Sequence, residues 1–225
     1  MKRMNKTWTS EIEKKYRLND ETNARRVVLA AIENGLIEKS WTLQRDLVPD
    51  FQGNLMRDKG VLLRIRTLDY LTGTGPTWIL TLKIKTVKDG VHHNQELESR
   101  SDDQTNSDKI NEYLYKNFGV SVDILKLVSL EPSYLEQIGL SEHRMYIEKR
   151  RREYKDDTEQ IVLAVDELPA PLGWFAEIEL GKRGDEASFS RWEKQLGLDE
   201  MVVLGSDYGQ LVKDADRDLS RRLSF

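Results

Sequence analysis

Short segments in which apolar and polar residues alternate recur along the 225-residue chain, and they constrain its fold more than any other feature. In residues 78–85, one face of an extended strand carries Leu80, Leu82 and Ile84, and the other carries Thr81, Lys83 and Lys85. Such a period of two is typical of a β-strand with one buried face. The same pattern occurs in residues 11–16, 63–68, 95–100, 145–154, 160–166 and 174–180, and residues 41–48 indicate one more strand. The chain is therefore expected to form mostly antiparallel sheet.

Helical patterns lie between these segments. Capping residues at 19–20 and at 106–107 each precede an apolar pattern of helical period, and the two patterns stop near Gly35 and Gly119. Further helices are predicted over residues 134–138, 188–196 and 207–219. The connections are short turns, so we expect one α+β domain over residues 1–225 with about seven or eight mostly antiparallel strands.

Composition excludes several kinds of site. The chain has no cysteine, which removes disulfides, thiolate zinc sites and cysteine nucleophiles. His92 and His93 are adjacent and follow a predicted turn, so we expect a solvated strand start there. The 35 basic and 39 acidic residues give a net charge of −4, which argues against a duplex-DNA binder. No apolar run reaches the roughly 18–20 residues of a membrane span, and the N-terminus lacks the apolar stretch of a secretory signal. A soluble cytoplasmic protein is expected.

Pairs of like charge occupy the polar faces of the predicted strands. The pairs are Glu11 and Glu13, Arg64 and Arg66, Lys83 and Lys85, Glu96 and Glu98, and Glu177 and Glu179. Residues i and i+2 of a strand project the same way, roughly 6.5–7 Å apart, so an acidic pair can bind one cation and a basic pair can hold successive phosphates. A merely solvated face is the simplest interpretation of one such strand. The nearly exclusive use of ionisable residues, segregated by sign, instead favours a barrel whose lumen holds divalent cations and a polyanion.

In this order, the motifs resemble those of the CYTH domain, also called the triphosphate tunnel metalloenzyme superfamily. The run Glu11-Ile12-Glu13-Lys14-Lys15 resembles its N-terminal Glu-x-Glu-x-Lys signature. Residues 64–66, 82–85, 96–98, 149–154 and 173–179 resemble the basic, acidic, Lys-x-Arg-x-x-Tyr and Gly-x-Phe-x-Glu-Ile-Glu strands that follow. The resemblance covers about residues 10–212 and implies an eight-stranded antiparallel β-barrel with flanking helices, whose lumen binds a triphosphate and a metal.

Two features depart from the family's pattern. Residues 120–145 are predicted to be an insertion before the Lys-Arg strand. Near the end of the chain, Asp207 separates Ser206 from Tyr208, and Gly205 stands where the family often has a basic residue. The second departure affects one phosphate contact at the rim of the tunnel.

The resemblance also implies a set of site residues. It places Glu11, Glu13 and Lys15 at the catalytic centre. The substrate-binding residues it implies are Lys15, Arg64, Arg66, Lys83, Lys85, Arg100, Lys149 and Arg151, and the metal ligands are Glu11, Glu13, Glu96, Glu98, Asp166, Glu177 and Glu179. All of these ligands are oxygen atoms, which suit Mg²⁺ or Mn²⁺ and not zinc. Strand alternation predicts that Lys149 and Arg151 face the lumen, whereas Arg150 and Arg152 face outward.

The expected function is metal-dependent hydrolysis of a triphosphate-containing small molecule, which could be inorganic tripolyphosphate, thiamine triphosphate or a nucleoside triphosphate. One alternative is a class IV adenylyl cyclase that converts ATP to cyclic AMP and pyrophosphate. Another is a non-catalytic module that binds polyphosphate or the 5′ end of RNA. The sequence shows no adenine pocket, which favours hydrolysis and predicts that tripolyphosphate is cleaved at least as well as ATP. No DNA or membrane partner is expected, and a homodimer is one option for the oligomeric state.

Overall fold

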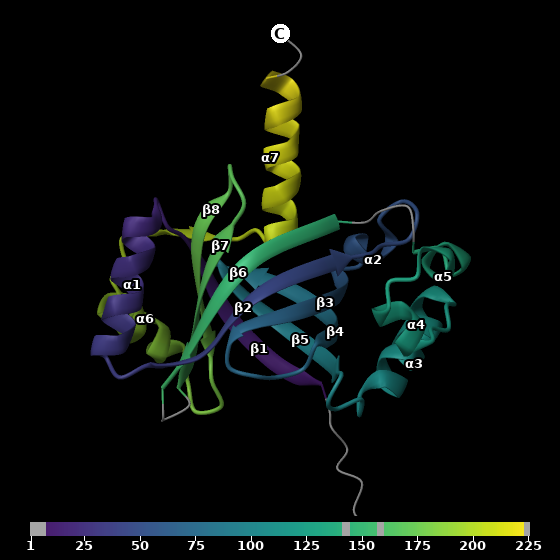
Figure 1. Ribbon diagram of the computed structural model, residues 1–225, viewed down its shortest axis with the longest axis horizontal. Coiled ribbons are helices and arrows are strands. Elements are labelled where there is room, and N and C mark those ends of the chain that lie inside the picture. The colour runs from purple at the N-terminus through teal and green to yellow at the C-terminus, as the bar shows by residue number, and fades with distance from the viewer. Residues whose placement is uncertain (1–7, 141–144, 157–159, 223–225) are drawn as a thin grey trace, which may run out of the picture.

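A closed β-barrel forms the centre of the computed structural model, which describes residues 8–140, 145–156 and 160–222 (Figure 1). The barrel strands are β1 (Thr9–Arg17), β2 (Ile37–Val48), β3 (Val61–Thr72), β4 (Trp78–Lys88), β5 (Val91–Arg100), β6 (Met145–Lys155), β7 (Ile161–Leu168) and β8 (Gly173–Leu180). They are hydrogen-bonded in the order β5-β4-β3-β2-β6-β7-β8-β1, and a further β1–β5 pairing closes the ring. The predicted eight-stranded antiparallel barrel is confirmed.

The N-terminal strand β1 closes the barrel because it pairs along both of its edges. Residues 9–14 pair with β5, and residues 13–17 pair with β8. Residues 15–17 also pair with a short ninth strand, β9 (Val202–Leu204). Every pairing is antiparallel, so neighbouring strands run in opposite directions. Within each strand, successive side chains point alternately into and out of the barrel.

The described part of the chain has seven helices beside the barrel or at its end. They are α1 (Glu21–Glu33), α2 (Leu55–Asp58), α3 (Ser107–Phe118), α4 (Ile124–Val128), α5 (Pro132–Gln137), α6 (Glu186–Leu196) and α7 (Tyr208–Arg222). The predicted cap of α1 forms, because the Asp20 carboxylate accepts a hydrogen bond from the Asn23 N–H at 2.8 Å, and Gly119 ends α3 with a φ of 72°. Asn106 precedes α3, but its side chain donates to the Glu98 carbonyl oxygen at 2.8 Å and does not cap the helix.

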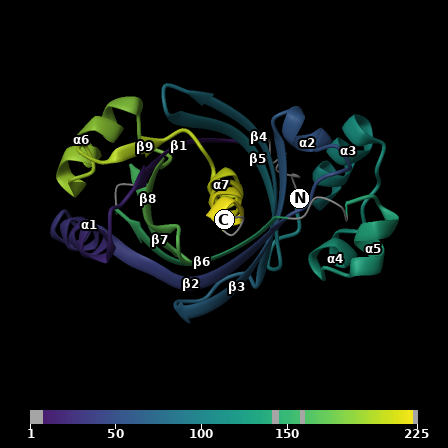
Figure 2. The same ribbon diagram turned by 90° about the horizontal axis from the view of Figure 1, so that it is seen from above.

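The hydrophobic core lies between the outer face of the barrel and the helices. One cluster joins β1, β7 and β8 to α1 and α6, and a second joins β3, β4 and β5 to α2–α5 (Figure 2). The predicted insertion supplies α4 and α5, whose Leu127 and Leu135 are fully buried in the second cluster. Residues 141–144 of that insertion lie outside the described residues. Because most aliphatic side chains point outward into these clusters, the inner face of the barrel is mainly polar.

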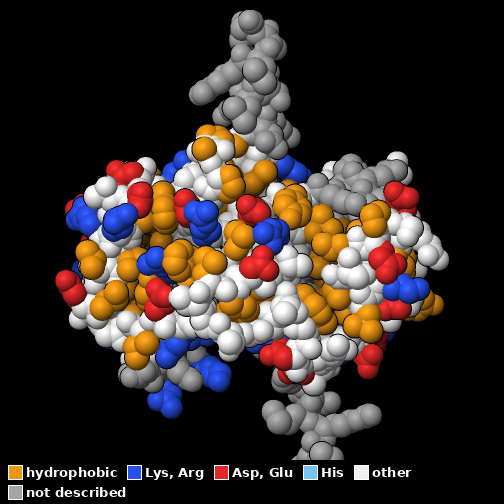
Figure 3. Space-filling view, viewed as in Figure 1, with side chains coloured by type: hydrophobic (Ala, Val, Ile, Leu, Met, Phe, Trp, Pro, Cys, Tyr) orange, Lys and Arg blue, Asp and Glu red, His pale blue; other side chains and the backbone are white. Residues whose placement is uncertain are grey.

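Helix α7 leaves one end of the barrel and lies over the centre of the ring when seen from above (Figures 1 and 2). Its first turn packs in a third cluster in which Tyr208 meets Ile147, Leu168 and Phe175. The turn between β3 and β4 lies at the opposite end, since antiparallel strands alternate in direction. On the face shown in Figure 3, basic, acidic and apolar side chains are interspersed. No helix within the described residues is long and apolar enough to cross a membrane.

Candidate active site in the barrel lumen

The barrel encloses a cavity of about 800 Å³. Every predicted site residue except Asp166 lines this cavity. The lining residues that were predicted are Glu11, Glu13, Lys15, Arg64, Arg66, Lys83, Lys85, Glu96, Glu98, Arg100, Lys149, Arg151, Glu177 and Glu179. Strand alternation brings them together, because each charged pair occupies positions of the same parity on its strand.

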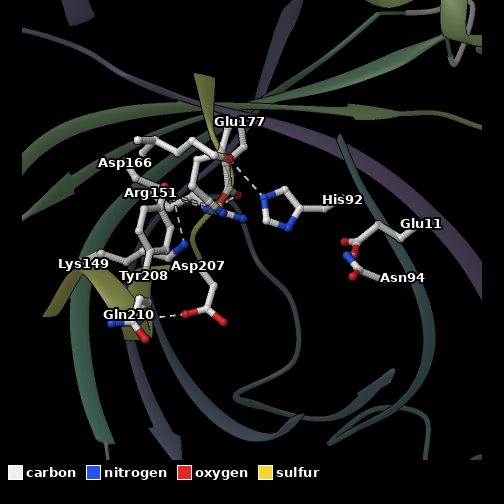
Figure 4. A network of polar contacts seen from close by, with 12 residues as sticks. Glu11, His92, Asn94, Lys149, Arg151, Asp166, Glu177, Asp207, Tyr208 and Gln210 are labelled. Carbon is white, nitrogen blue, oxygen red and sulfur yellow. Dashed lines mark hydrogen bonds and ion pairs between the residues drawn. The ribbon is translucent and has the colours of Figure 1, made fainter. Parts of the chain in front are cut away.

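A network of buried ion pairs covers the wall formed by β6, β7 and β8 (Figure 4). The Arg151 guanidinium donates two hydrogen bonds to Asp166, at 2.7 and 2.6 Å, and also pairs with Glu177. The Nζ of Lys149 lies 3.0 Å from Asp166, and Lys15 pairs with Glu177. Burial opposes ionisation of Asp166, but the charges of Arg151 and Lys149 hold the pKa of its carboxyl below the usual value. Burial, together with Arg151, lowers the pKa of Lys149 to about 7.

The start of α7 belongs to this network. The Tyr208 hydroxyl donates a hydrogen bond to Asp166 at 2.6 Å. Its ring lies 4.3 Å from the Lys15 Nζ and 4.6 Å from the Lys149 Nζ, within cation–π range. Asp207 pairs with Lys85 and caps α7 by accepting a hydrogen bond from the Gln210 N–H at 2.8 Å. The end of the chain therefore contributes to the lumen through two consecutive side chains.

Lys83 joins two acidic strands. Its Nζ lies 2.5 Å from a carboxylate oxygen of Glu11 on β1 and 2.5 Å from one of Glu96 on β5. The Asn94 amide adds a hydrogen bond to the same Glu11 oxygen at 2.8 Å. Burial alone would raise the pKa of Glu11, but Lys83 leads the effects that lower it.

The two arginines of β3 differ in their partners. Arg66 donates two hydrogen bonds to Asp46 on β2, at 2.6 and 2.7 Å, and both side chains are buried. Arg64 donates only one, from Nη2 to the Thr81 hydroxyl at 3.1 Å, and its buried Nε has no hydrogen-bond partner among the described residues. Arg64 is therefore the arginine of this pair with more donor capacity left for a ligand.

Glu13 and Glu179 lie directly opposite each other on β1 and β8. Within the described residues, neither has an ion-pair partner. Burial, reinforced by the charges of Glu11 and Glu13, raises the pKa of Glu179 to about 8. Carboxylates crowded in this way fit a divalent cation by donor chemistry. However, no group of three or more acidic or histidine side chains is arranged as a metal site in the part of the chain that the structure describes, and Glu11 is bound to Lys83 instead.

Outside the lumen, strand parity is confirmed on β6. Arg150 is 60% exposed and pairs with Glu167 at 3.3 Å on the outer surface. The Arg152 guanidinium lies 4.4 Å from the centre of the Trp41 ring. Arg100 and Glu98 lie in the lumen but are more exposed, and their charged atoms are 3.9 Å apart.

Several lumen residues were missed or misread from the sequence, and His92 and Asp46 show why. The expectation of a solvated strand start is wrong for His92, which is buried, lines the cavity and has its Nε2 3.2 Å from the Leu204 carbonyl oxygen. β5 begins immediately after a tight turn, so His92 already pairs opposite Glu13 of β1. Asp46 was missed altogether. In both cases parity was the available signal, because His92 is in phase with Glu96, and Asp46 alternates inward on β2.

No protein-family model matches the sequence, and no curated protein sequence matches it. Solved structures do match. A protein from Pyrococcus horikoshii superposes with a TM-score of 0.60 and 18% identity over 91% of this chain and 99% of that one. HpAC1 from Hippeastrum, a candidate adenylyl cyclase with dominant triphosphatase activity, superposes with a TM-score of 0.58 and 19% identity over 91% of this chain and 96% of that one. A chain of the Schizosaccharomyces pombe Mediator head module superposes with a TM-score of 0.51 and 10% identity over 87% of this chain and 100% of that one. The chain has the fold of the CYTH, or triphosphate tunnel, proteins.

Proposed function

We propose that the protein is a metal-dependent hydrolase of a triphosphate bound in the barrel lumen. One observation carries this proposal: a single cavity gathers all of the predicted basic residues together with the carboxylates of Glu11, Glu13 and Glu179. A polyanion would offset the positive wall, and a cation would offset the acidic one. The same fold is present in the Hippeastrum protein, whose triphosphatase activity is dominant.

The basic residues would contact the phosphates in different ways. Arg64 offers a buried donor without a partner, and Lys83 could exchange a carboxylate for a phosphate oxygen. Arg151 and Lys149 are held in place by Asp166 and Glu177, so they would present a fixed positive surface that needs little reorganisation. These contacts favour positioning roles for Asp166 and Glu177 over the metal-ligand roles that the resemblance implies.

Glu11, Glu13 and Glu179 would hold Mg²⁺ or Mn²⁺, which when bound would neutralise charge on the phosphates. Holding the terminal phosphoryl group in one orientation is what most of the lumen side chains would contribute, because phosphoryl transfer depends mainly on positioning and electrostatic stabilisation.

A substrate panel tests the proposal. Tripolyphosphate, thiamine triphosphate, ATP and GTP would each be incubated with the protein and Mg²⁺ or Mn²⁺, and the products separated. Metal-dependent release of orthophosphate is expected. Cyclic AMP and pyrophosphate from ATP would instead establish a cyclase in the same tunnel. Tight binding of a triphosphate without turnover would identify a binding module.

A further inference from the structure

One sector of the tunnel wall is built from uncharged side chains. It comprises Thr42 and Gln44 on β2, Leu68 and Tyr70 on β3, and Ile79 on β4, all of which line the cavity. The register pairs Thr42 with Tyr70 and Gln44 with Leu68, and β4 is the next strand around the barrel. We call these five residues the neutral sector. It lies toward the β3–β4 turn, at the end of the barrel opposite α7.

The apolar side chains of the neutral sector, Leu68 and Ile79, line the cavity and are 8% and 7% exposed. Leu68 and Ile79 belong to none of the three hydrophobic clusters of the described residues. At the other end of the tunnel the situation differs, because Ile147 packs with Leu211 and Val212 of α7. A ligand with an apolar surface would therefore meet, at the neutral sector, apolar side chains that no hydrophobic cluster covers.

Gln44 supplies a polar group that points to the nature of that ligand. Its side chain is 95% buried, and its Nε2 donates a hydrogen bond to the Thr42 hydroxyl at 3.1 Å. Its Oε1 is buried and has no hydrogen-bond partner among the described residues. An unpaired buried acceptor is costly, so this oxygen calls for a donor. A fully ionised phosphate offers acceptors only, whereas an organic group can offer an N–H or O–H.

Tyr70 lies at the mouth of the sector with a fixed orientation. Its hydroxyl lies so close to Gly75 in the β3–β4 turn that a Cβ at position 75 would overlap it. The half-buried ring thus presents an aromatic surface beside the cavity. Such a surface suits stacking by another planar ring. The cavity volume of about 800 Å³ also falls in the range of roughly 300–1,000 Å³ typical of organic small-molecule sites.

We propose that the neutral sector binds the heteroaromatic group of an organic triphosphate, so that the substrate is an organic triphosphate and not inorganic tripolyphosphate. This proposal rests on the proposed function, and it specifies the substrate class. It departs from the sequence-based expectation for tripolyphosphate because the five residues come from three strands and become neighbours only in the folded barrel.

The test compares kcat/KM for ATP and thiamine triphosphate with that for tripolyphosphate, in the wild-type protein and in two variants. Gln44→Leu removes the unpaired acceptor. Gly75→Ala displaces the Tyr70 ring without altering it chemically. The wild type is expected to prefer at least one organic triphosphate, and each variant should lower that preference by about tenfold, roughly the value of one buried hydrogen bond or ring contact. The ratio of kcat/KM for ATP to kcat/KM for thiamine triphosphate identifies which heterocycle the sector prefers.

Matched controls use the same residue types outside the sector. Gln195→Leu alters an exposed glutamine on α6, and Gly205→Ala adds a Cβ that meets no atom within 4 Å. Neither should change the preference. Turnover of tripolyphosphate in preference to both organic substrates, or an unchanged preference in both sector variants, would overturn the inference while leaving the proposed hydrolase intact. Failure to bind or turn over any of the three would overturn both. Cyclic AMP from ATP would support the neutral sector and replace hydrolysis by cyclisation.

Discussion

The two halves of the tunnel wall use the same kinds of residue to opposite effect. On β6–β8, Asp166 is fully buried and receives hydrogen bonds from Arg151, Lys149 and Tyr208. Where β1 meets β8, Glu179 faces carboxylates, and the pKa of its own carboxyl is raised to about 8 by burial and by those charges. In the first half the buried carboxylates are paired with basic side chains, whereas in the second Glu13 and Glu179 have no ion-pair partner among the described residues.

The difference distinguishes carboxylates that stabilise the fold, such as Asp166, from carboxylates that are available to bind a cation, such as Glu179. Removing one partner from a compensated buried network leaves a charge unpaired and costs several kcal/mol. Removing one of several repelling carboxylates costs the fold little, because it relieves repulsion. A single acidic residue can thus be tested for its role by whether its loss harms folding or activity.

The largest effect is expected for Glu13→Ala. Activity should fall by at least about a hundredfold, since loss of a cation ligand removes several kcal/mol of charge neutralisation from the transition state. Stability in urea should stay the same or rise. Glu112→Ala, which alters an exposed glutamate on α3, serves as the control. Near wild-type turnover of Glu13→Ala at saturating Mg²⁺ would remove Glu13 from the proposed cation site.

Asp166→Asn should show the reverse pattern for stability. The change leaves Arg151 and Lys149 buried with one carboxylate fewer, so the free energy of unfolding should fall by about 3 kcal/mol. Urea denaturation measures this directly. The neighbouring Glu167→Gln, which breaks only an exposed pair with Arg150, should change it by less than about 1 kcal/mol. Equal stabilities of the two variants would show that the network is not a structural unit.

Arg64→Ala should raise KM for a triphosphate by about tenfold or more, because it removes charge-assisted hydrogen bonds from the lumen. Arg66→Ala should also raise KM. Because it leaves the buried Asp46 carboxylate without its ion-pair partner, it should lower stability as well. Arg150→Ala should leave KM unchanged, since that side chain is on the outer surface. A comparable KM for all three variants would contradict the assigned strand parity.

A smaller effect concerns pH. Burial, together with the charges of Glu11, Glu13 and Glu153, raises the pKa of the Glu179 carboxyl above its ordinary value of 4.5 to about 8, and Lys83 opposes them. The folded protein then binds more protons than the unfolded chain, so metal-free stability should fall as pH rises from about 5 to about 8. Thermal unfolding across this range should show a shallower slope for Glu179→Gln. A slope as steep as that of the wild type would assign the dependence to other groups.

Local patterns predicted the strands and most helices, and they predicted which side chains face the lumen, whereas the eight-stranded barrel was implied by the resemblance to the CYTH domain. Alternation placed Lys149 and Arg151 inward and Arg150 outward, and the capping residue Asp20 marked the start of α1. Patterns of this kind depend on residues close in sequence, so they can be read without the tertiary structure.

Which charges compensate one another was not predictable in the same way. Asp46 acquires its role only because β2 lies beside β3 and faces Arg66. Asp207 and Tyr208 reach the lumen only because α7 starts over the end of the barrel. The neutral sector likewise depends on strand order. These features follow from long-range packing, which a single sequence does not reveal.

The closure of the barrel by β1 has a consequence for how the protein folds. Lys15 on β1 meets Glu177 on β8, 162 residues further along the chain. Contacts between such distant segments form slowly, because the entropy lost on closing the loop precedes the interactions that offset it. β1 also carries Glu11 and Glu13, so the acidic edge of the lumen is assembled in the same step that completes the ring. During refolding, the capacity to bind a triphosphate is therefore expected to appear only in the slowest phase, after most of the helical circular dichroism signal has returned.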